Sequence, residues 1–162
     1  MAEDAMEQHK AFLRRAIALA VKNVEAGNGG PFGAVIVREG QVVAEAGNSV
    51  FTANDPTAHA EVNAIRAACQ KLGVFRLEGC TLYTSSEPCP MCLAACYWAH
   101  LDCIFYAANA EDAARAGFDD AFLYRELALP ASKRTLPAKE MLRDEAQASF
   151  AAWDVSPCKQ PY

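Results

Sequence analysis

Apolar residues recur at helical spacing over residues 5–26, where Phe12, Ala16, Leu19, Ala20 and Val24 follow a 3.6-residue repeat. Charged side chains fill many of the positions between them. A glycine-rich stretch that ends in proline, residues 27–31, then interrupts the pattern. We therefore expect an amphipathic helix that buries one of its faces.

Residues 32–107 alternate between strand-like and helix-like patterns. Two β-rich runs, 32–37 and 41–46, flank a turn at Glu39 and Gly40 and predict a hairpin. Helical patterns follow at 58–72, closed by Gly73, and at 89–99, with buried-type strands at 80–84 and 103–107. This order favours an α/β architecture with a partly parallel sheet.

The pattern weakens after residue 108. Short helices are expected at 110–116, 121–127 and 146–153, and residues 155–162, with two prolines, resemble a tail. Residues 135–142 could form a fifth strand or a helix. We expect one domain over residues 1–162, because this length suits a single hydrophobic core.

Composition narrows the class of protein. The net charge of −5 argues against a polyanionic partner, because nucleic-acid binders usually display a basic patch. No apolar run approaches the ~20 residues that span a bilayer. The acidic N-terminus lacks the basic and apolar regions of a secretion signal, so we expect a cytoplasmic protein. With seven cysteines in a reducing compartment, metal ligation is favoured over disulfides.

The residues with the most specific chemistry are His59 and Glu61, followed by Cys89 and Cys92. One imidazole and two thiolates give three protein ligands, so tetrahedral zinc would keep a fourth position for water. Cys89 and Cys92 lie three residues apart at a helix start, where Pro88 suits an opening turn. The spacing predicts a catalytic zinc site. The alternative is a closed structural zinc site whose fourth ligand is not evident.

This chemistry suits a hydrolysis in which water attacks an electron-poor carbon. Water is a poor nucleophile at neutral pH, and zinc can lower its pKa from 15.7 to about 7. Two thiolates leave zinc a weaker acid than three histidines would. We therefore infer that Glu61 removes the proton from the attacking water and later delivers it to the base, acting as general base and then as general acid.

The H-x-E and P-C-x-x-C motifs resemble those of the cytidine-deaminase-like superfamily of zinc deaminases. The resemblance covers essentially the whole chain, through GGPFGAVIV (29–37), NDPTAHAEVNAIR (54–66), LYTSSEPCPMC (82–92) and AGFDDAFLY (116–124). The last segment and the aromatic C-terminus favour the branch that deaminates guanine. One departure is Ser86, where relatives often have cysteine.

The resemblance implies a three-layer α/β/α fold with a five-stranded mixed sheet, one zinc ion per subunit and a small purine as partner. It also implies a homodimer in which the C-terminal segment, residues 144–162, closes over an active site and is possibly swapped between subunits. Carried over residue by residue, it assigns zinc to His59, Cys89 and Cys92, and proton transfer to Glu61. The implied contacts with the base are Asn48, Phe32, Trp98, Ala60, Asp120 as a second carboxylate and Tyr162 as a lid residue.

Simpler interpretations remain for several of these residues. Asp120, with Asp119, could be a solvated pair in a loop, and Asn48 could only cap a turn. Phe32 and Trp98 could be ordinary core residues. For the activity, the alternatives are a tRNA adenosine deaminase, a deaminase of cytosine, a nucleoside or an aminated triazine, and a zinc-binding module without catalysis.

Overall fold

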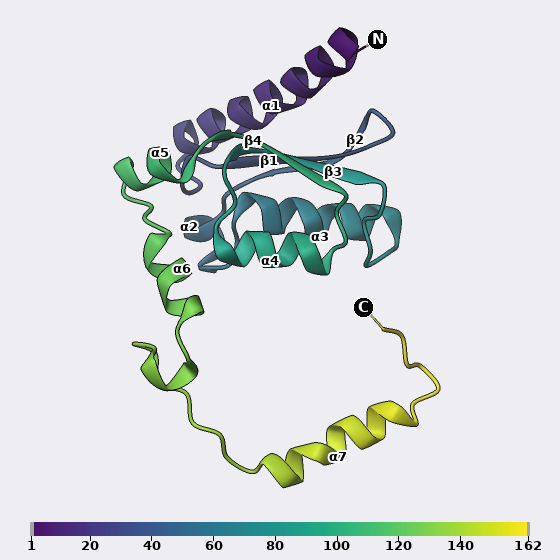
Figure 1. Ribbon diagram of the computed structural model, residues 1–162. Coiled ribbons are helices and arrows are strands. Elements are labelled where there is room, and N and C mark those ends of the chain that lie inside the picture. The colour runs from purple at the N-terminus through teal and green to yellow at the C-terminus, as the bar shows by residue number, and fades with distance from the viewer. Residues whose placement is uncertain (1, 162) are drawn as a thin grey trace. The chain divides into compact units, whose positions relative to one another are not determined.

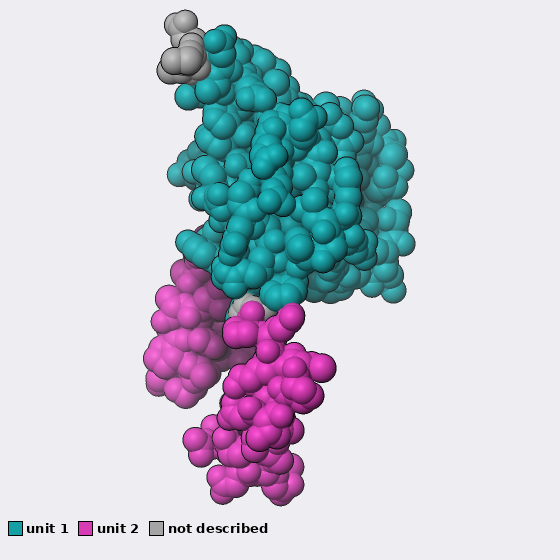
Figure 2. Space-filling model, turned by 90° about the vertical axis from the view of Figure 1, so that its right-hand side faces the viewer, with its two compact units in different colours: residues 1–120 teal, residues 121–162 magenta. Residues whose placement is uncertain are grey.

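A computed structural model describes residues 2–161 and divides the chain into two compact units, residues 1–120 and residues 121–162 (Figure 2). The first unit contains α1 (Ala2–Glu25), β1 (Gly33–Arg38), β2 (Gln41–Gly47), α2 (Val50–Ala53), α3 (Ala60–Leu72), β3 (Cys80–Ser86), α4 (Pro90–Trp98), β4 (Cys103–Ala108) and α5 (Ala110–Arg115). The second unit contains α6 (Ala121–Ala128), a 3₁₀ turn (Ala131–Lys133) and α7 (Arg143–Asp154). The expected helices and strands of residues 5–107 are thus confirmed.

The sheet has the strand order β2-β1-β3-β4. β1 runs antiparallel to both β2 and β3, whereas β3 and β4 are parallel and are joined by α4. The expected mixed sheet is confirmed. At the carboxyl end of β3 the chain leads directly into the loop that begins α4, and this end of a parallel pair is where α/β folds place their sites.

The prediction of five strands is wrong for the residues that the structure describes, because the sheet has four. Residues 135–142 form neither a strand nor a helix. Pro137 lacks the N–H that a ladder requires, and the side chains of Leu136 and Met141 are exposed. This segment has no buried face with which to join a sheet.

The sheet is covered on both faces, which gives the first unit three layers (Figure 1). Ala34 and Ile36 of β1 pack in the core cluster that includes residues of α3 and α4. Val35 and Val37, which alternate with them, pack with Tyr83 and with Ala16 of α1. Strand β1, buried over its first five residues, therefore belongs to two cores, one on each face.

At Gly33, α1 lies very close to the sheet. A Cβ atom at this position would lie 2.3 Å from the backbone oxygen of Ala16 and 2.7 Å from the backbone nitrogen of Ala20. Only glycine allows the helix to lie this near the strand. Among the described residues, no helix is both long enough and apolar enough to cross a membrane.

Candidate active site

The candidate metal ligands lie at the beginnings of two helices. His59 is the N-cap of α3 and Cys89 is the N-cap of α4, and both have extended backbones, with ψ angles of 154° and 166°. Pro90 follows Cys89 at the first helical position, where a missing N–H costs little. Cys92 lies in the first turn of α4, on the same side as Cys89. Each helix start presents free N–H groups, whose partial positive charge favours thiolate.

The three ligand atoms are close enough to share one cation. The imidazole, Cys89 and Cys92 each offer an atom within 4.8 Å of the others. His59 Nδ1 lies 3.6 Å from the sulfur of Cys89 and 3.5 Å from that of Cys92. Zinc bonds of about 2.0 Å to nitrogen and 2.3 Å to sulfur place tetrahedral ligand atoms about 3.5–3.8 Å apart. The donor set and its spacing therefore fit zinc.

The electrostatics of the group also favour a cation. The hydrogen bond from Cys92 lowers the pKa of the Cys89 thiol to about 4, and sharing this proton raises the pKa of Cys92. The same thiolate raises the pKa of His59 through a hydrogen bond. Two sulfurs that share one proton would both ionise around a bound divalent cation, which replaces that proton.

Glu61 lies beside this group in the first turn of α3. Its side chain is only 4% exposed. Thr84 Oγ1 donates to Oε1 at 3.4 Å, and the Cys92 thiol donates to Oε2 at 3.5 Å. Burial raises the pKa of this carboxyl above its ordinary value. A carboxyl held in this way can accept a proton and retain it close to the metal ligands.

The ligand group opens into a cavity of about 210 Å³ that is formed within the first unit. This volume lies below the ~300–1,000 Å³ of pockets for drug-sized ligands and suits a smaller ring system. His59, Glu61 and Cys89 contribute its polar part. Phe32 and Phe118 contribute an aromatic wall, with ring centroids 4.9 Å apart and planes at 81°.

Asn48 also lines the cavity, and its amide has a defined orientation. Its Oδ1 accepts from the backbone N–H groups of Gly30 and Val50, both at 3.2 Å. Because both partners are donors, the side-chain oxygen must face them. The NH₂ group of Asn48 keeps its two protons for other acceptors. Asn23 Nδ2 donates to the backbone oxygen of Asn48 at 2.7 Å and holds the main chain.

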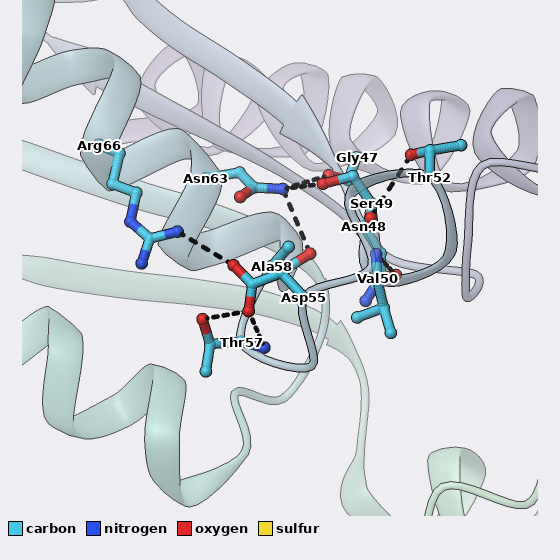
Figure 3. Close-up of polar contacts among 10 residues, drawn as sticks. All are labelled: Gly47, Asn48, Ser49, Val50, Thr52, Asp55, Thr57, Ala58, Asn63 and Arg66. Atoms are coloured by element: carbon cyan, nitrogen blue, oxygen red, sulfur yellow. Dashed lines mark hydrogen bonds and ion pairs between the residues drawn. The ribbon is translucent and has the colours of Figure 1, made fainter.

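A second asparagine ties this loop to α3 (Figure 3). Asn63 Nδ2 lies within hydrogen-bond distance of the Gly47 oxygen at 3.1 Å, Ser49 Oγ at 3.0 Å and the Ala58 oxygen at 3.2 Å. Its acceptors thus span the end of β2, the loop after it and the residue before His59. The amide links the segment that carries Asn48 to the segment that carries the candidate histidine ligand.

Asp120, the second expected carboxylate, lines the cavity as well. Burial is the main cause that raises its pKa, followed by the nearby Cys89. Asp119 is more exposed and does not line the cavity. Of the two interpretations of this acidic pair, the arrangement favours a solvated Asp119 and an Asp120 that faces the site.

Two of the expected contacts, Trp98 and Ala60, are not among the described residues that line the cavity. Trp98, at the end of α4, is 63% exposed, and Ala60 is fully buried in the core. Neither belongs to the described lining. Tyr162 lies outside the described residues. The contacts of these three residues with a base therefore stay predictions.

Sequence reasoning missed several residues that line the cavity. Val50 and Phe51 belong to α2, a four-residue helix too short to show a period. Phe118 had a signal, since it belongs to the AGFDD segment, but no periodic pattern placed it opposite Phe32. Ser86 lines the cavity too, but in the sequence it stood out only because relatives often have cysteine at this position.

The number of ligands distinguishes a catalytic site from a structural one. Within residues 2–161, the group that could hold a metal has three members, His59, Cys89 and Cys92. A closed structural site requires four. The arrangement therefore favours a metal with a position left for a substrate or for water.

Comparisons with known proteins agree with this site. Residues 6–108 match the family described as the cytidine and deoxycytidylate deaminase zinc-binding region. The chain is 57% identical over 145 residues to guanine deaminase of Bacillus subtilis (strain 168), a match that covers 90% of this chain and 93% of that protein. It is 43% identical over 97 residues to a tRNA-specific adenosine deaminase of Aquifex aeolicus (strain VF5), which covers 60% of this chain and 64% of that one.

Solved structures extend the similarity to three dimensions. The X-ray structure of guanine deaminase from Bacillus subtilis aligns with a TM-score of 0.92 at 55% identity, covering 95% of this chain and 98% of that chain. A related protein in complex with 2,6-diaminopurine aligns with a TM-score of 0.66 at 33% identity, covering 69% of this chain and 62% of that chain. The resemblance inferred from the motifs is confirmed, and the chain belongs to the cytidine and deoxycytidylate deaminase family of zinc-binding proteins.

Proposed function

We propose that this chain is a zinc-dependent aminohydrolase that converts guanine and water to xanthine and ammonia. The observation that carries the proposal is the position of Glu61 beside the three metal ligands in a small cavity, in a chain 57% identical to a guanine deaminase. Related structures hold purine compounds, which supports a small purine as the ligand.

His59, Cys89 and Cys92 would hold the zinc ion. Zinc supplies a Lewis acid that makes water nucleophilic near neutral pH. The residues of the chain then control the protons. Glu61 takes a proton from the attacking water as the carbon–oxygen bond forms, and delivers it to a ring nitrogen of the base. The proton of the newly added hydroxyl then passes through the same carboxyl to the amine, so that a carbonyl forms and ammonia leaves as the carbon–nitrogen bond breaks.

Thr84 helps Glu61 to do this work. Its hydroxyl donates to Oε1 and holds the carboxyl on the floor of the cavity. Burial raises the pKa of Glu61 above its ordinary value, which favours the protonated form more than in an exposed carboxyl. A carboxyl that takes and returns a proton requires both forms to be accessible.

The walls of the cavity select the base. Phe32 offers a ring against which a purine can stack, and Phe118 supports it edge to face. The NH₂ group of Asn48 would donate to an acceptor on the purine, its carbonyl oxygen or the ring edge. The carboxylate of Asp120 would accept from an N–H of the base. Trp98, Ala60 and Tyr162 remain predicted contacts.

We further propose a homodimer in which residues 144–162 close over an active site of the partner. The second unit offers support from its own surface, because α7 has no buried residue and exposes Phe150 and Trp153. Exposed apolar side chains of this kind are typical of an interaction surface. Exchange of this segment would provide the missing partner.

Ammonia release from the zinc-loaded protein tests the activity. The substrates to compare are guanine, guanosine, adenine, cytosine, an aminated triazine and a tRNA stem-loop, with Glu61→Gln as the control. We expect release from guanine and loss of that release in the variant. Release from the stem-loop alone would replace guanine deamination by tRNA adenosine deamination, and release from none would favour a zinc-binding module.

A further inference from the structure

Strand β3 presents two hydroxyl groups on the face that carries the site. Alternate residues of a strand share a face, so Leu82, Thr84 and Ser86 point toward the layer of α3 and α4. The hydroxyl of Thr84 is used, because it donates to Glu61. Ser86 lies two residues further along, at the end of the strand, where it lines the cavity.

The hydroxyl of Ser86 has no partner among the described residues. The residue is only 5% exposed, and its Oγ atom is inaccessible and makes no hydrogen bond. Most buried polar side-chain atoms in proteins are paired, so an unpaired hydroxyl needs an explanation. It is the one buried side-chain oxygen or nitrogen in the described part of the chain that is left without a partner.

Neighbouring polar groups on the cavity wall are already engaged in the fold. Glu87 Oε2 accepts from the backbone N–H of Ala110 at 3.0 Å, and Asn48 Oδ1 accepts from two backbone groups. On the opposite face of β3, Ser85 Oγ accepts from the Gly33 N–H at 3.0 Å. Ser85 and Ser86 are adjacent and both buried, yet only Ser85 contributes a hydrogen bond to the folded chain.

We propose that Ser86 is a substrate-binding residue whose hydroxyl, closed off in the free protein, turns toward the cavity and hydrogen-bonds a ring nitrogen of the bound purine. A hydroxyl can donate to a bare ring nitrogen or accept from a ring N–H, so it suits either. Each ring nitrogen of a purine can be replaced by carbon in a separate analogue, and each such replacement removes one polar atom. This inference rests on the proposed function, because it requires a purine in the cavity.

The proposal predicts effects of opposite sign on folding and on binding. Removal of an unpaired buried hydroxyl should leave the stability of the free protein unchanged or raise it, whereas removal of a paired one lowers it. Ser86→Ala should therefore keep or raise the unfolding temperature and weaken guanine binding. Ser85→Ala, the matched control, should lower the unfolding temperature and leave discrimination among purines unchanged.

The experiment combines Ser86→Ala, Ser85→Ala and the wild type, all zinc-loaded. Guanine turnover gives KM and kcat, and the 3-, 7- and 9-deaza analogues of guanine are measured as competitive inhibitors. In Ser86→Ala we expect kcat/KM for guanine to fall roughly 5- to 30-fold, mainly through KM. One analogue, which lacks the nitrogen that Ser86 contacts, should bind the wild type more weakly than guanine does, by a similar factor. The affinity of this analogue should be the same for Ser86→Ala as for the wild type, because the hydrogen bond is absent in both cases.

Ser86→Cys provides a second variant of nearly the same size. A thiol is a weaker hydrogen-bond donor than a hydroxyl, so the KM of Ser86→Cys should lie between those of the wild type and Ser86→Ala. A lower unfolding temperature for Ser86→Ala, an unchanged KM, or additive losses for all three analogues would overturn the inference while wild-type turnover of guanine stands. Absence of guanine turnover in the wild type would refute the proposed function and this inference with it.

Discussion

Glu61 is buried and also lines the cavity, as a residue that carries protons to a substrate must. Its side chain is buried, yet it lies on the floor of the cavity beside His59 and Cys89. Substitution by glutamine preserves size and can still accept from Thr84, but it cannot take up a proton. We expect Glu61→Gln to retain zinc and to lose turnover by several orders of magnitude, roughly 10³-fold or more. Ammonia release and the zinc content of the same sample check this, and near-normal turnover would exclude the proton-transfer role.

Mutation can separate the structural role of the Asn48 oxygen, which holds the turn, from the proposed role of its NH₂ group, which contacts the base. Asn48→Asp keeps an oxygen for the N–H groups of Gly30 and Val50, but removes the NH₂ donor and adds negative charge beside Glu61. We expect kcat/KM for guanine to fall roughly 10- to 100-fold with little change in stability.

Asn48→Ala is the comparison variant for this prediction. It removes the acceptor as well, so both kcat/KM and the unfolding temperature should fall. Steady-state kinetics and thermal unfolding measure the two effects. If Asn48→Asp binds guanine as well as the wild type does, Asn48 only caps the turn.

The metal ligands were predictable from sequence because their information is local. Cys89 and Cys92 are three residues apart, and His59 and Glu61 are two residues apart, so each pair is placed by one helix start. Phe118 was not predictable in this way. It reaches Phe32 across 86 residues of sequence, counting from 32 to 118, and no spacing rule links the two.

At the scale of elements, Asn63 joins β2, the loop after it and α3 through one NH₂ group. Asn63→Ala should leave the Gly47 and Ala58 carbonyls without this donor and cost about 1–3 kcal/mol of stability. Because the loop carries Asn48, KM for guanine should also rise. Asn63→Asp offers only acceptors to the same carbonyls and should be the more damaging of the two.

Thermal unfolding and KM, measured together, test this positioning role. Arg66→Ala is the control, since Arg66 of the same helix contacts Asp55, which follows α2, only at 3.9 Å and at the surface. An exposed pair of this kind contributes little, about 0–1 kcal/mol. Equal effects of Asn63→Ala and Arg66→Ala would remove the special role of the amide.

Gly33 tests the packing of α1 on the sheet. In Gly33→Ala, the new methyl group would meet backbone atoms of Ala16 and Ala20, which cannot rotate away as side chains do. We expect α1 to shift from β1 at a cost of about 1–3 kcal/mol. Amide hydrogen exchange should then quicken in α1 more than in α3.

Gly73→Ala is the matched control for this packing prediction. Gly73 has a φ of +68°, and a Cβ atom added there would meet open space, so the cost of the substitution arises from the backbone alone. Exchange in α1 should stay as in the wild type for this control. Unchanged stability in Gly33→Ala would show that α1 can move away from β1 at no cost.

Strand β1 was predictable from sequence because it is buried without interruption. β1 is buried over five consecutive residues, and its apolar run shows this directly. α2 has four residues and no buried member, so no pattern predicted it. The expected fifth strand failed for the converse reason, because a few apolar residues near 135–142 are exposed and have no partner strand.

At the scale of the whole molecule, both units leave apolar surface open. In the first unit, Ile17, Val21 and Val24 of α1 line an apolar groove with Pro31. In the second, α6 and α7 have no buried residue. Side chains such as these favour association, because burial of apolar area stabilises a complex. The proposed homodimer with exchanged C-terminal segments would give these exposed apolar side chains of both units a partner surface.

Mixed dimers provide the decisive test of exchange. Deletion of Tyr162 should reduce guanine turnover without preventing folding, and Glu61→Gln should abolish turnover in its own site. If the segment acts on the partner's site, a dimer of one subunit of each kind contains one complete site, with Glu61 from one chain and the C-terminus from the other. Random pairing of equal amounts of the two variants should then add about a quarter of the wild-type rate to what the variants show alone, as expected for a twofold dimer.

The controls for this test lie in the same samples. Each variant refolded alone should keep its own low rate, and light scattering should show dimers in all of the samples. Restoration that grows with the fraction of mixed dimers means that the C-terminus closes the neighbouring site, since neither chain carries a complete site of its own. If mixing restores nothing although mixed dimers form, the segment acts within its own chain or has no part in catalysis.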